Sequence, residues 1–130
     1  MTSYTAITSN VEISVSSRYY PPMSDSENKT FVFVYHICIQ NRGKQPVHIL
    51  RRYWKIKDSA GFSHEVNGEG VVGEKPIILP NESYEYESWC HLQTDMGSMK
   101  GHYEALLLDT QEEVKIEIPE FLLIPEYKLN

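Results

Sequence analysis

The sequence contains only two cysteines, Cys38 and Cys90, among 130 residues. A chain of this length buries roughly two thirds of its unfolded surface, so one hydrophobic core can hold it without disulfide bonds. The cytoplasm is the compartment expected for a chain with neither a signal peptide nor a membrane-spanning run, and in that reducing environment thiols stay free and pack as small hydrophobic side chains. We therefore expect no disulfide and a cytoplasmic protein.

Long apolar runs are also missing, because no stretch approaches the roughly 18 apolar residues of a membrane-spanning helix. The first residues, Met1 to Thr5, lack the basic and apolar regions of a signal peptide. Basic residues are scarce as well: 12 lysines and arginines stand against 18 acidic residues, for a net charge of -6. A dedicated duplex-DNA binder is therefore not expected, since nonspecific affinity for nucleic acid comes mostly from a basic surface.

Hydrophobic residues recur every second position, which is the period of a β-strand. The alternating runs are Val11–Val15, Phe31–Ile39, Leu50–Lys57, Tyr84–Glu87, Tyr103–Leu107 and Val114–Ile118. In the second run both faces carry apolar residues, so that strand is predicted to be covered on both sides near its centre. In the third run Leu50, Trp54 and Ile56 are expected on the core face.

Turn residues separate these runs at intervals of about ten residues. Asp58 to Gly61 is typical of a hairpin turn, and no window combines helical spacing with a cap and a stop signal. We predict an all-β fold, an immunoglobulin-like or fibronectin type III-like antiparallel β-sandwich of seven to eight strands. The order Cys38, Trp54, Cys90 resembles the cysteine–tryptophan–cysteine pin of immunoglobulin domains. In that pattern a tyrosine lies two residues before the second cysteine, and here that residue is Ser88.

A glycine-rich segment, Gly68, Gly70 and Gly73, matches the pattern G-x-G-x-x-G that cradles pyrophosphate. That cradle needs a buried strand before it and a helix N-terminus after it. Here polar residues precede the segment, and Pro76 and Pro80 bracket an extended stretch behind it. The alternative is a structural loop that needs positive φ or close packing, although an amide nest could still hold a small anion.

A basic and aromatic strip follows from the alternation in the third run, which sends Arg51, Tyr53, Lys55 and Lys57 to one face. Such a strip can bind single-stranded nucleic acid or a phosphorylated partner. The alternative is an outer face of the sheet that is simply exposed to solvent. Arg52 falls on the Trp54 side, where it is expected to pair with a carboxylate or lie at the rim of the sheet.

Metal-binding and catalytic motifs are missing too. The five histidines, at positions 36, 48, 64, 91 and 102, form no pair with zinc-site spacing, so no metal site and no cofactor are predicted. No nucleophile motif occurs, and Glu85, Glu87, Glu113 and Glu117 are expected to be solvating charges. The sequence predicts that the protein is not an enzyme.

Two blocks are highly specific: V-x-G-E-G-V-V-G from Val66 to Gly73, and G-x-M-x-G-x-Y from Gly97 to Tyr103. Together with Asn41–Gly43, Arg52–Asp58, Ile118-Pro119 and Ile13–Tyr19, they make nearly the whole chain similar to the ApaG family of small bacterial proteins. The chain departs from the family at Pro80-Asn81, where Pro-Gly is usual. Because asparagine tolerates the left-handed conformation, the turn is expected to survive.

The resemblance implies a β-sandwich, a genetic association with cobalt and magnesium resistance or efflux, and a role as a protein-interaction module. It also implies the alternative of a small-anion or nucleotide and pyrophosphate binder that uses loop 68–73. We expect one domain over residues 1–130, with a core from about residue 8 to about residue 124 and an apolar tail over 119–130. The tail is expected to pack on the sandwich or on a partner, and edge strands could support a homodimer.

Overall fold

The computed structural model describes residues 3–128, which form nine strands and two short 3-10 turns. The strands are β1 (Ser3–Thr8), β2 (Val11–Tyr19), β3 (Phe31–Asn41), β4 (Val47–Asp58), β5 (Ser63–Glu69), β6 (Ile77–Ile78), β7 (Ser83–Leu92), β8 (Gly97–Leu107) and β9 (Glu112–Leu123). The turns are η1 (Pro21–Met23) and η2 (Glu126–Lys128). In residues 3–128, no helix has the length and apolarity that crossing a membrane requires.

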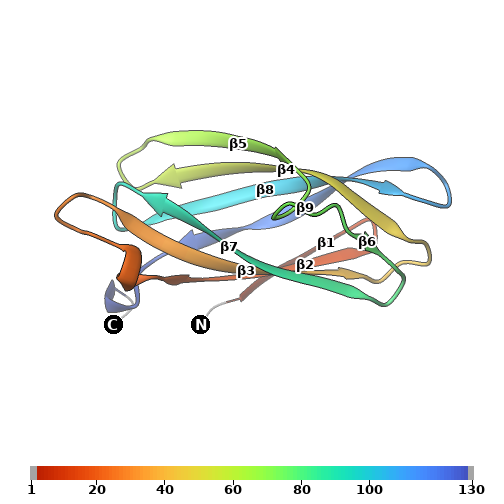
Figure 1. Ribbon diagram of the computed structural model, residues 1–130, viewed down its shortest axis with the longest axis horizontal. Coiled ribbons are helices and arrows are strands. Elements are labelled where there is room, and N and C mark those ends of the chain that lie inside the picture. The colour runs from red at the N-terminus through yellow and green to blue at the C-terminus, as the bar shows by residue number, and fades with distance from the viewer. Residues whose placement is uncertain (1–2, 129–130) are drawn as a thin grey trace.

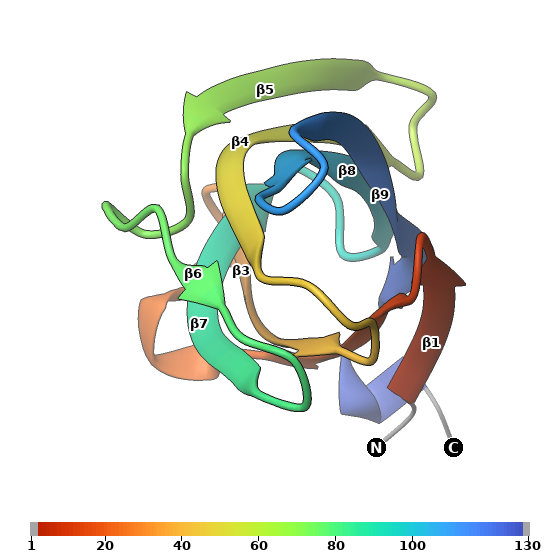
Figure 2. The same ribbon diagram turned by 90° about the vertical axis from the view of Figure 1, so that its right-hand side faces the viewer.

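Two antiparallel sheets face each other, which confirms the predicted β-sandwich (Figure 1). The first sheet has the order β1-β2-β3-β7, and the second has the order β5-β4-β8-β9, with β6 paired to the start of β4. In the end-on view of Figure 2, β5 is the outermost strand of its sheet. The structure has nine strands where seven to eight were predicted, because the sequence pattern does not reveal β1, β5 or β6. The half-buried positions of β1 are not an apolar series, β5 is mostly polar and exposed, and β6 has only two residues.

The core lies between the sheets and is filled by alternate residues of the long strands, as period two requires. Trp54 of β4 is 2% exposed and packs against Tyr35 of β3 and Phe121 of β9, with ring centroids 5.4 and 5.9 Å apart. The edge-on contact between Trp54 and Tyr35 connects the two sheets, whereas Phe121 belongs to the same sheet as Trp54. The prediction that Trp54 and Ile56 face the core is confirmed.

Leu50 was predicted on the core face, and that prediction is wrong. The register of β4 against β8 shifts between Ile49 and Arg51, which marks a β-bulge at Leu50. A bulge inserts one unpaired residue and changes which side chains face inward. Ile49 is therefore buried and Leu50 is half-buried, while the alternation beyond the bulge continues as predicted.

The outer face of β3 is less covered than its apolar residues suggest. Val32 is 3% exposed, but Val34, His36 and Cys38 are only half-buried. The β2–β3 connection is held against this end of the strand, because the Ser24 hydroxyl accepts a hydrogen bond from the Val32 amide at 2.9 Å. The predicted burial on both faces holds only at the beginning of this strand.

The apolar tail is the second half of β9 as far as Leu123. Pro119 lies where the β8–β9 register shifts, and a proline fits such a position because its missing amide is not needed there. Phe121 and Leu123 then return to the core, each 0% exposed. The tail therefore packs on the sandwich, while its last two residues, 129 and 130, lie outside the described part of the chain.

Both cysteines are free, and both lie in the first sheet, on β3 and β7. An immunoglobulin pin joins opposite sheets, so this placement differs from that pattern. Burial raises the pKa of the Cys90 thiol to about 12, which keeps it protonated at neutral pH.

Candidate functional site

The outer face of the second sheet carries the four predicted interaction residues in one line. Arg51, Tyr53, Lys55 and Lys57 alternate with buried or half-buried residues along β4. Cross-strand pairing extends each of them into a row across β5 and β8, because directly opposed residues share a face. The rows are Glu69–Arg51–Glu104, Asn67–Tyr53–His102, Glu65–Lys55–Lys100 and Ser63–Lys57–Ser98.

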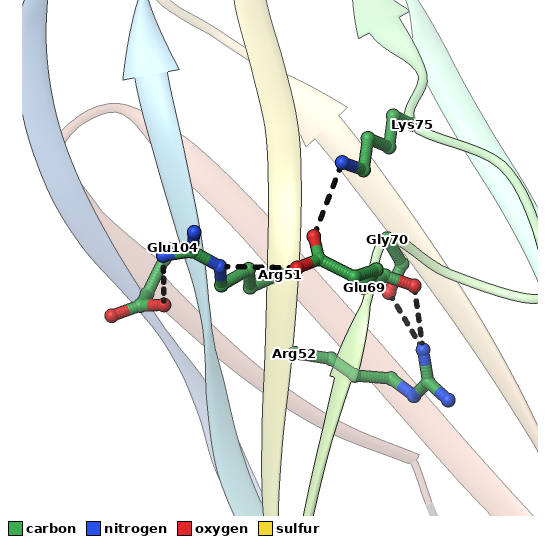
Figure 3. A network of polar contacts seen from close by, with 6 residues as sticks. All are labelled: Arg51, Arg52, Glu69, Gly70, Lys75 and Glu104. Carbon is green, nitrogen blue, oxygen red and sulfur yellow. Dashed lines mark hydrogen bonds and ion pairs between the residues drawn. The ribbon is translucent and has the colours of Figure 1, made fainter.

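The first row forms a chain of ion pairs that Lys75 extends (Figure 3). The Arg51 guanidinium lies 3.5 Å from the Glu69 carboxylate and 3.8 Å from that of Glu104, and the Lys75 ammonium lies 3.1 Å from Glu69. A hydrogen bond from Lys75, with further help from Arg51, lowers the pKa of Glu69. The charge of Arg51 is therefore balanced within the protein, although sequence reasoning grouped it with the available cations.

An aromatic pair forms the second row. The rings of Tyr53 and His102 stack with centroids 4.9 Å apart and planes inclined by 25°. A hydrogen bond to Glu65 raises the pKa of Tyr53, and burial followed by the charge of Lys115 lowers the pKa of His102. At neutral pH this pair is an uncharged flat surface between the ion-pair network and the lysines.

The lysines of the third and fourth rows gather beyond this stack. Lys55 lies directly opposite Lys100, and Lys57 follows two residues later on the same face. None of the ion pairs formed within residues 3–128 includes any of these three lysines. We call Lys55, Lys57 and Lys100 the lysine cluster.

A shallow groove of about 620 Å³ runs beside the lysine cluster. Tyr53, Lys100, His102, Lys115 and Pro119 are among its lining residues. Lys100 and His102 were missed by sequence reasoning, which treated each strand alone. Only the β4–β8 register shows that they extend the predicted strip.

Arg52 points to the other side of the sheet and holds the glycine loop. It donates hydrogen bonds to the backbone carbonyls of Glu69 and Gly70, at 2.9 and 3.0 Å (Figure 3). The expectation of a carboxylate partner is therefore corrected: carbonyl oxygens take that place. A Cβ at Gly68 would lie 2.6 Å from the Arg52 guanidinium, so glycine at this position makes room for the arginine.

The other two glycines serve a tight turn. Gly70 has φ +60°, and a Cβ there would overlap the Glu74 carbonyl. Val71 and Glu74 exchange backbone hydrogen bonds of 2.8 and 2.9 Å across Val72 and Gly73, both of which have positive φ. Two successive left-handed residues define a type I′ turn, which explains glycine at position 73.

The same hydrogen bonds bear on the nucleotide hypothesis. The amides of Gly70, Val71 and Glu74 already donate to backbone carbonyls, that of Gly70 to Leu50 at 2.8 Å. The strand before the loop, β5, is exposed, and β6 follows the loop in place of a helix. Loop 68–73 thus has a structural role, and anion binding at this loop stays a prediction.

The predicted turn at Asn81 has the expected geometry. Asn81 adopts φ +69°, in the left-handed region that glycine would otherwise occupy. Its amide donates to the Asn41 carbonyl at 2.8 Å, which ties the turn to the end of β3.

The outward carboxylates and the histidines are dispersed. Glu85 pairs with His36 at 2.9 Å and Glu87 with Arg18 at 3.2 Å on the first sheet, whereas Glu113 and Glu117 are exposed on β9. No group of three or more histidine, cysteine or acidic residues able to hold a metal ion occurs within residues 3–128.

Inside the sandwich, the hydroxyls of Tyr86 and Tyr103 are hydrogen-bonded to each other. Burial is the largest cause that raises the pKa of each, so both phenols stay protonated near neutral pH. Each buried hydroxyl thereby has a hydrogen-bond partner within the core.

Comparison with known proteins agrees with the resemblance noted in the sequence. The family model described as the ApaG domain matches residues 21–106. Protein ApaG of Proteus mirabilis is 45% identical over 116 residues, covering 88% of this chain and 91% of that protein. Protein ApaG of Parvibaculum lavamentivorans is 39% identical over 127 residues, covering 98% of this chain and 92% of that protein.

A solved structure shares the fold. The crystal structure of a Bordetella pertussis protein, named as a candidate ApaA, superposes with a TM-score of 0.86 at 37% identity. The superposition covers 89% of this chain and 94% of the Bordetella pertussis chain. Since the ApaG family model and these relatives match most of its length, this chain belongs to the ApaG family.

Proposed function

We propose that this protein is a non-enzymatic binding module that holds a protein partner on the outer face of the sheet β5-β4-β8-β9. The observation that carries this proposal is the lysine cluster, whose three cations have no ion-pair partner within residues 3–128 of a chain with net charge -6. Arg51, at the other end of the same face, differs from these lysines because the carboxylates of Glu69 and Glu104 balance its charge.

The buried titratable groups support binding rather than catalysis. A general base or nucleophile needs a pKa near the operating pH, or a depressed one. Burial instead raises the pKa values of Cys90, Tyr86 and Tyr103. These groups are unsuited to acid–base or nucleophilic chemistry at neutral pH.

A capture experiment tests the proposal. We expect the wild-type protein to recover a partner from cell lysate, and the double variant Lys55→Glu/Lys57→Glu to lose it. Lys44→Glu is the matched control, because Lys44 is exposed in the β3–β4 loop, away from this face. Equal recovery by all three proteins, or no recovery by wild type, would contradict the proposal.

We further propose that the association with cobalt and magnesium implied by the family resemblance acts through the partner and not through a metal site on this chain. A ligand that binds the native state raises the unfolding midpoint. Millimolar cobalt or magnesium should therefore leave the midpoint unchanged, and a concentration-dependent rise would refute this part of the proposal.

A further inference from the structure

We propose that the lysine cluster binds an extended acidic segment of a partner protein, with carboxylates that interleave between Lys55, Lys57 and Lys100. This inference rests on the proposed function and specifies the chemistry of the partner. It starts from an unusual feature of the β4–β8 pair, the direct opposition of two lysines.

Like charges on directly opposed residues destabilise a sheet, because the Cβ atoms of such residues lie roughly 4.5–5.5 Å apart. Lys55 and Lys100 occupy such positions. Glu65 faces Lys55 from β5, but no ion pair joins the two side chains within residues 3–128. The folded protein therefore retains a repulsion that an anionic ligand would relieve.

The spacing of the cluster matches an extended peptide. Lys55 and Lys57 are alternate residues of β4, so they lie roughly 6.5–7 Å apart along the strand. Acidic side chains at alternate positions of an extended segment have the same spacing. The stacked Tyr53 and His102 rings give the segment a flat, uncharged surface beside the lysines.

A protein segment fits better than nucleic acid. The cluster is confined to one end of the face, and the other end holds Glu69 and Glu104 with Arg51 between them. Glu117 and Glu120 also border the groove. A phosphate backbone that extended beyond the three lysines would meet these carboxylates, whereas a short acidic segment would not.

The test is fluorescence anisotropy at low ionic strength with a labelled octapeptide of alternating glutamate and serine. We expect the wild-type protein to bind it and to lose binding as salt is added, because charge pairs near a surface are screened. A glutamine–serine octapeptide should not bind. Lys55→Gln/Lys100→Gln should weaken binding roughly five- to tenfold, the effect of losing two exposed charge pairs, while Lys44→Gln should not change it.

A second variant separates recognition from structure. Lys100→Glu replaces the repulsion with an opposed pair of unlike charges, so we expect its unfolding midpoint to rise while octapeptide binding is lost. A fall in the midpoint would overturn the premise that the lysines repel each other. A purely structural role for Lys100 would not predict stabilisation together with loss of binding.

The remaining outcomes discriminate between the two proposals. Oligothymidylate that binds more tightly than the acidic octapeptide would overturn the inference and reassign the surface to nucleic acid. Failure of the octapeptide, with lysate capture still dependent on Lys55 and Lys57, would overturn the acidic segment alone. Failure of both would overturn the proposed function as well.

Discussion

Val72 is the residue whose backbone departs most from its side-chain preference. It has φ +47° and is 57% exposed at the tip of the glycine-loop turn. A β-branched side chain in the left-handed region is a conformational outlier, and such a residue costs roughly 1–2 kcal/mol. The strain is local, because nothing buried depends on this side chain.

Val72→Asn should therefore raise the free energy of unfolding by about 1 kcal/mol, since asparagine tolerates this conformation. Urea denaturation measures the change. Val66→Asn is the control: Val66 is also exposed but lies in the extended strand β5, so that variant should be neutral or slightly destabilised. Equal effects at both positions would show that backbone strain is not the cause.

His102 links this face to pH. Its pKa is lowered from its usual value near 6.5 by burial and by Lys115, against the opposing effect of Glu117 and Glu104. Between the lowered pKa and 6.5 the unfolded chain binds more protons than the folded one, so the contribution of His102 to stability falls as pH falls.

We expect the wild-type protein to lose more unfolding free energy between about pH 7.5 and about pH 5 than the His102→Gln variant does. Parallel denaturation series at each pH measure this difference. Identical pH profiles would mean that His102 titrates alike in the folded and unfolded states, and that burial beside Lys115 has no energetic consequence.

At the scale of the element, β9 shows how a break in a pattern can mislead. Its first half alternates clearly, and Pro119 indicates an end of the strand to a reader of the sequence. The strand continues because the register shift at this point removes the need for the proline amide. The core therefore includes Phe121 and Leu123.

Neighbouring residues of β9 should respond very differently to truncation. Phe121→Ala removes a fully buried ring and should cost about 3–5 kcal/mol, whereas Leu122→Ala, at a 48% exposed side chain, should cost less than about 1 kcal/mol. Thermal or urea unfolding of the two variants provides the measurement. Similar small losses would place this half of the strand outside the core.

The strand β4 shows the complementary error. Its outward residues were correctly grouped from alternation alone, yet Leu50 was placed inside because a bulge cannot be read from apolar spacing. The basic strip was nevertheless predicted correctly, because the residues from Arg51 to Lys57 all follow the bulge and keep their alternation. Prediction succeeded where the local period was unbroken.

At the scale of the whole molecule, Trp54 joins the two sheets. It contacts Tyr35 on the opposite sheet and Phe121 on its own sheet. Gly101 of β8 lies beside it, where a Cβ would overlap the Tyr53 carbonyl and lie 3.1 Å from the indole ring. The Trp54 side chain thus holds the two sheets together beneath the outer face that carries the lysine cluster.

Trp54→Ala should cost about 3–5 kcal/mol, because the cavity it leaves has both sheets as walls. Equilibrium unfolding followed by tyrosine fluorescence or circular dichroism measures the loss. A change below about 1 kcal/mol would contradict the assignment of strand faces.

The sequence by itself determined six of the long strands, the inward and outward faces of their unbroken stretches, most turns and the basic strip, because alternation and turn chemistry are properties of neighbouring residues. Tertiary structure decided which residues meet across strands. It placed Lys100 opposite Lys55, stacked His102 on Tyr53, neutralised Arg51 with Glu69 and Glu104, and turned Arg52 toward the carbonyls of the glycine loop. Register between strands depends on bulges and on the whole core, so no local pattern could specify these encounters.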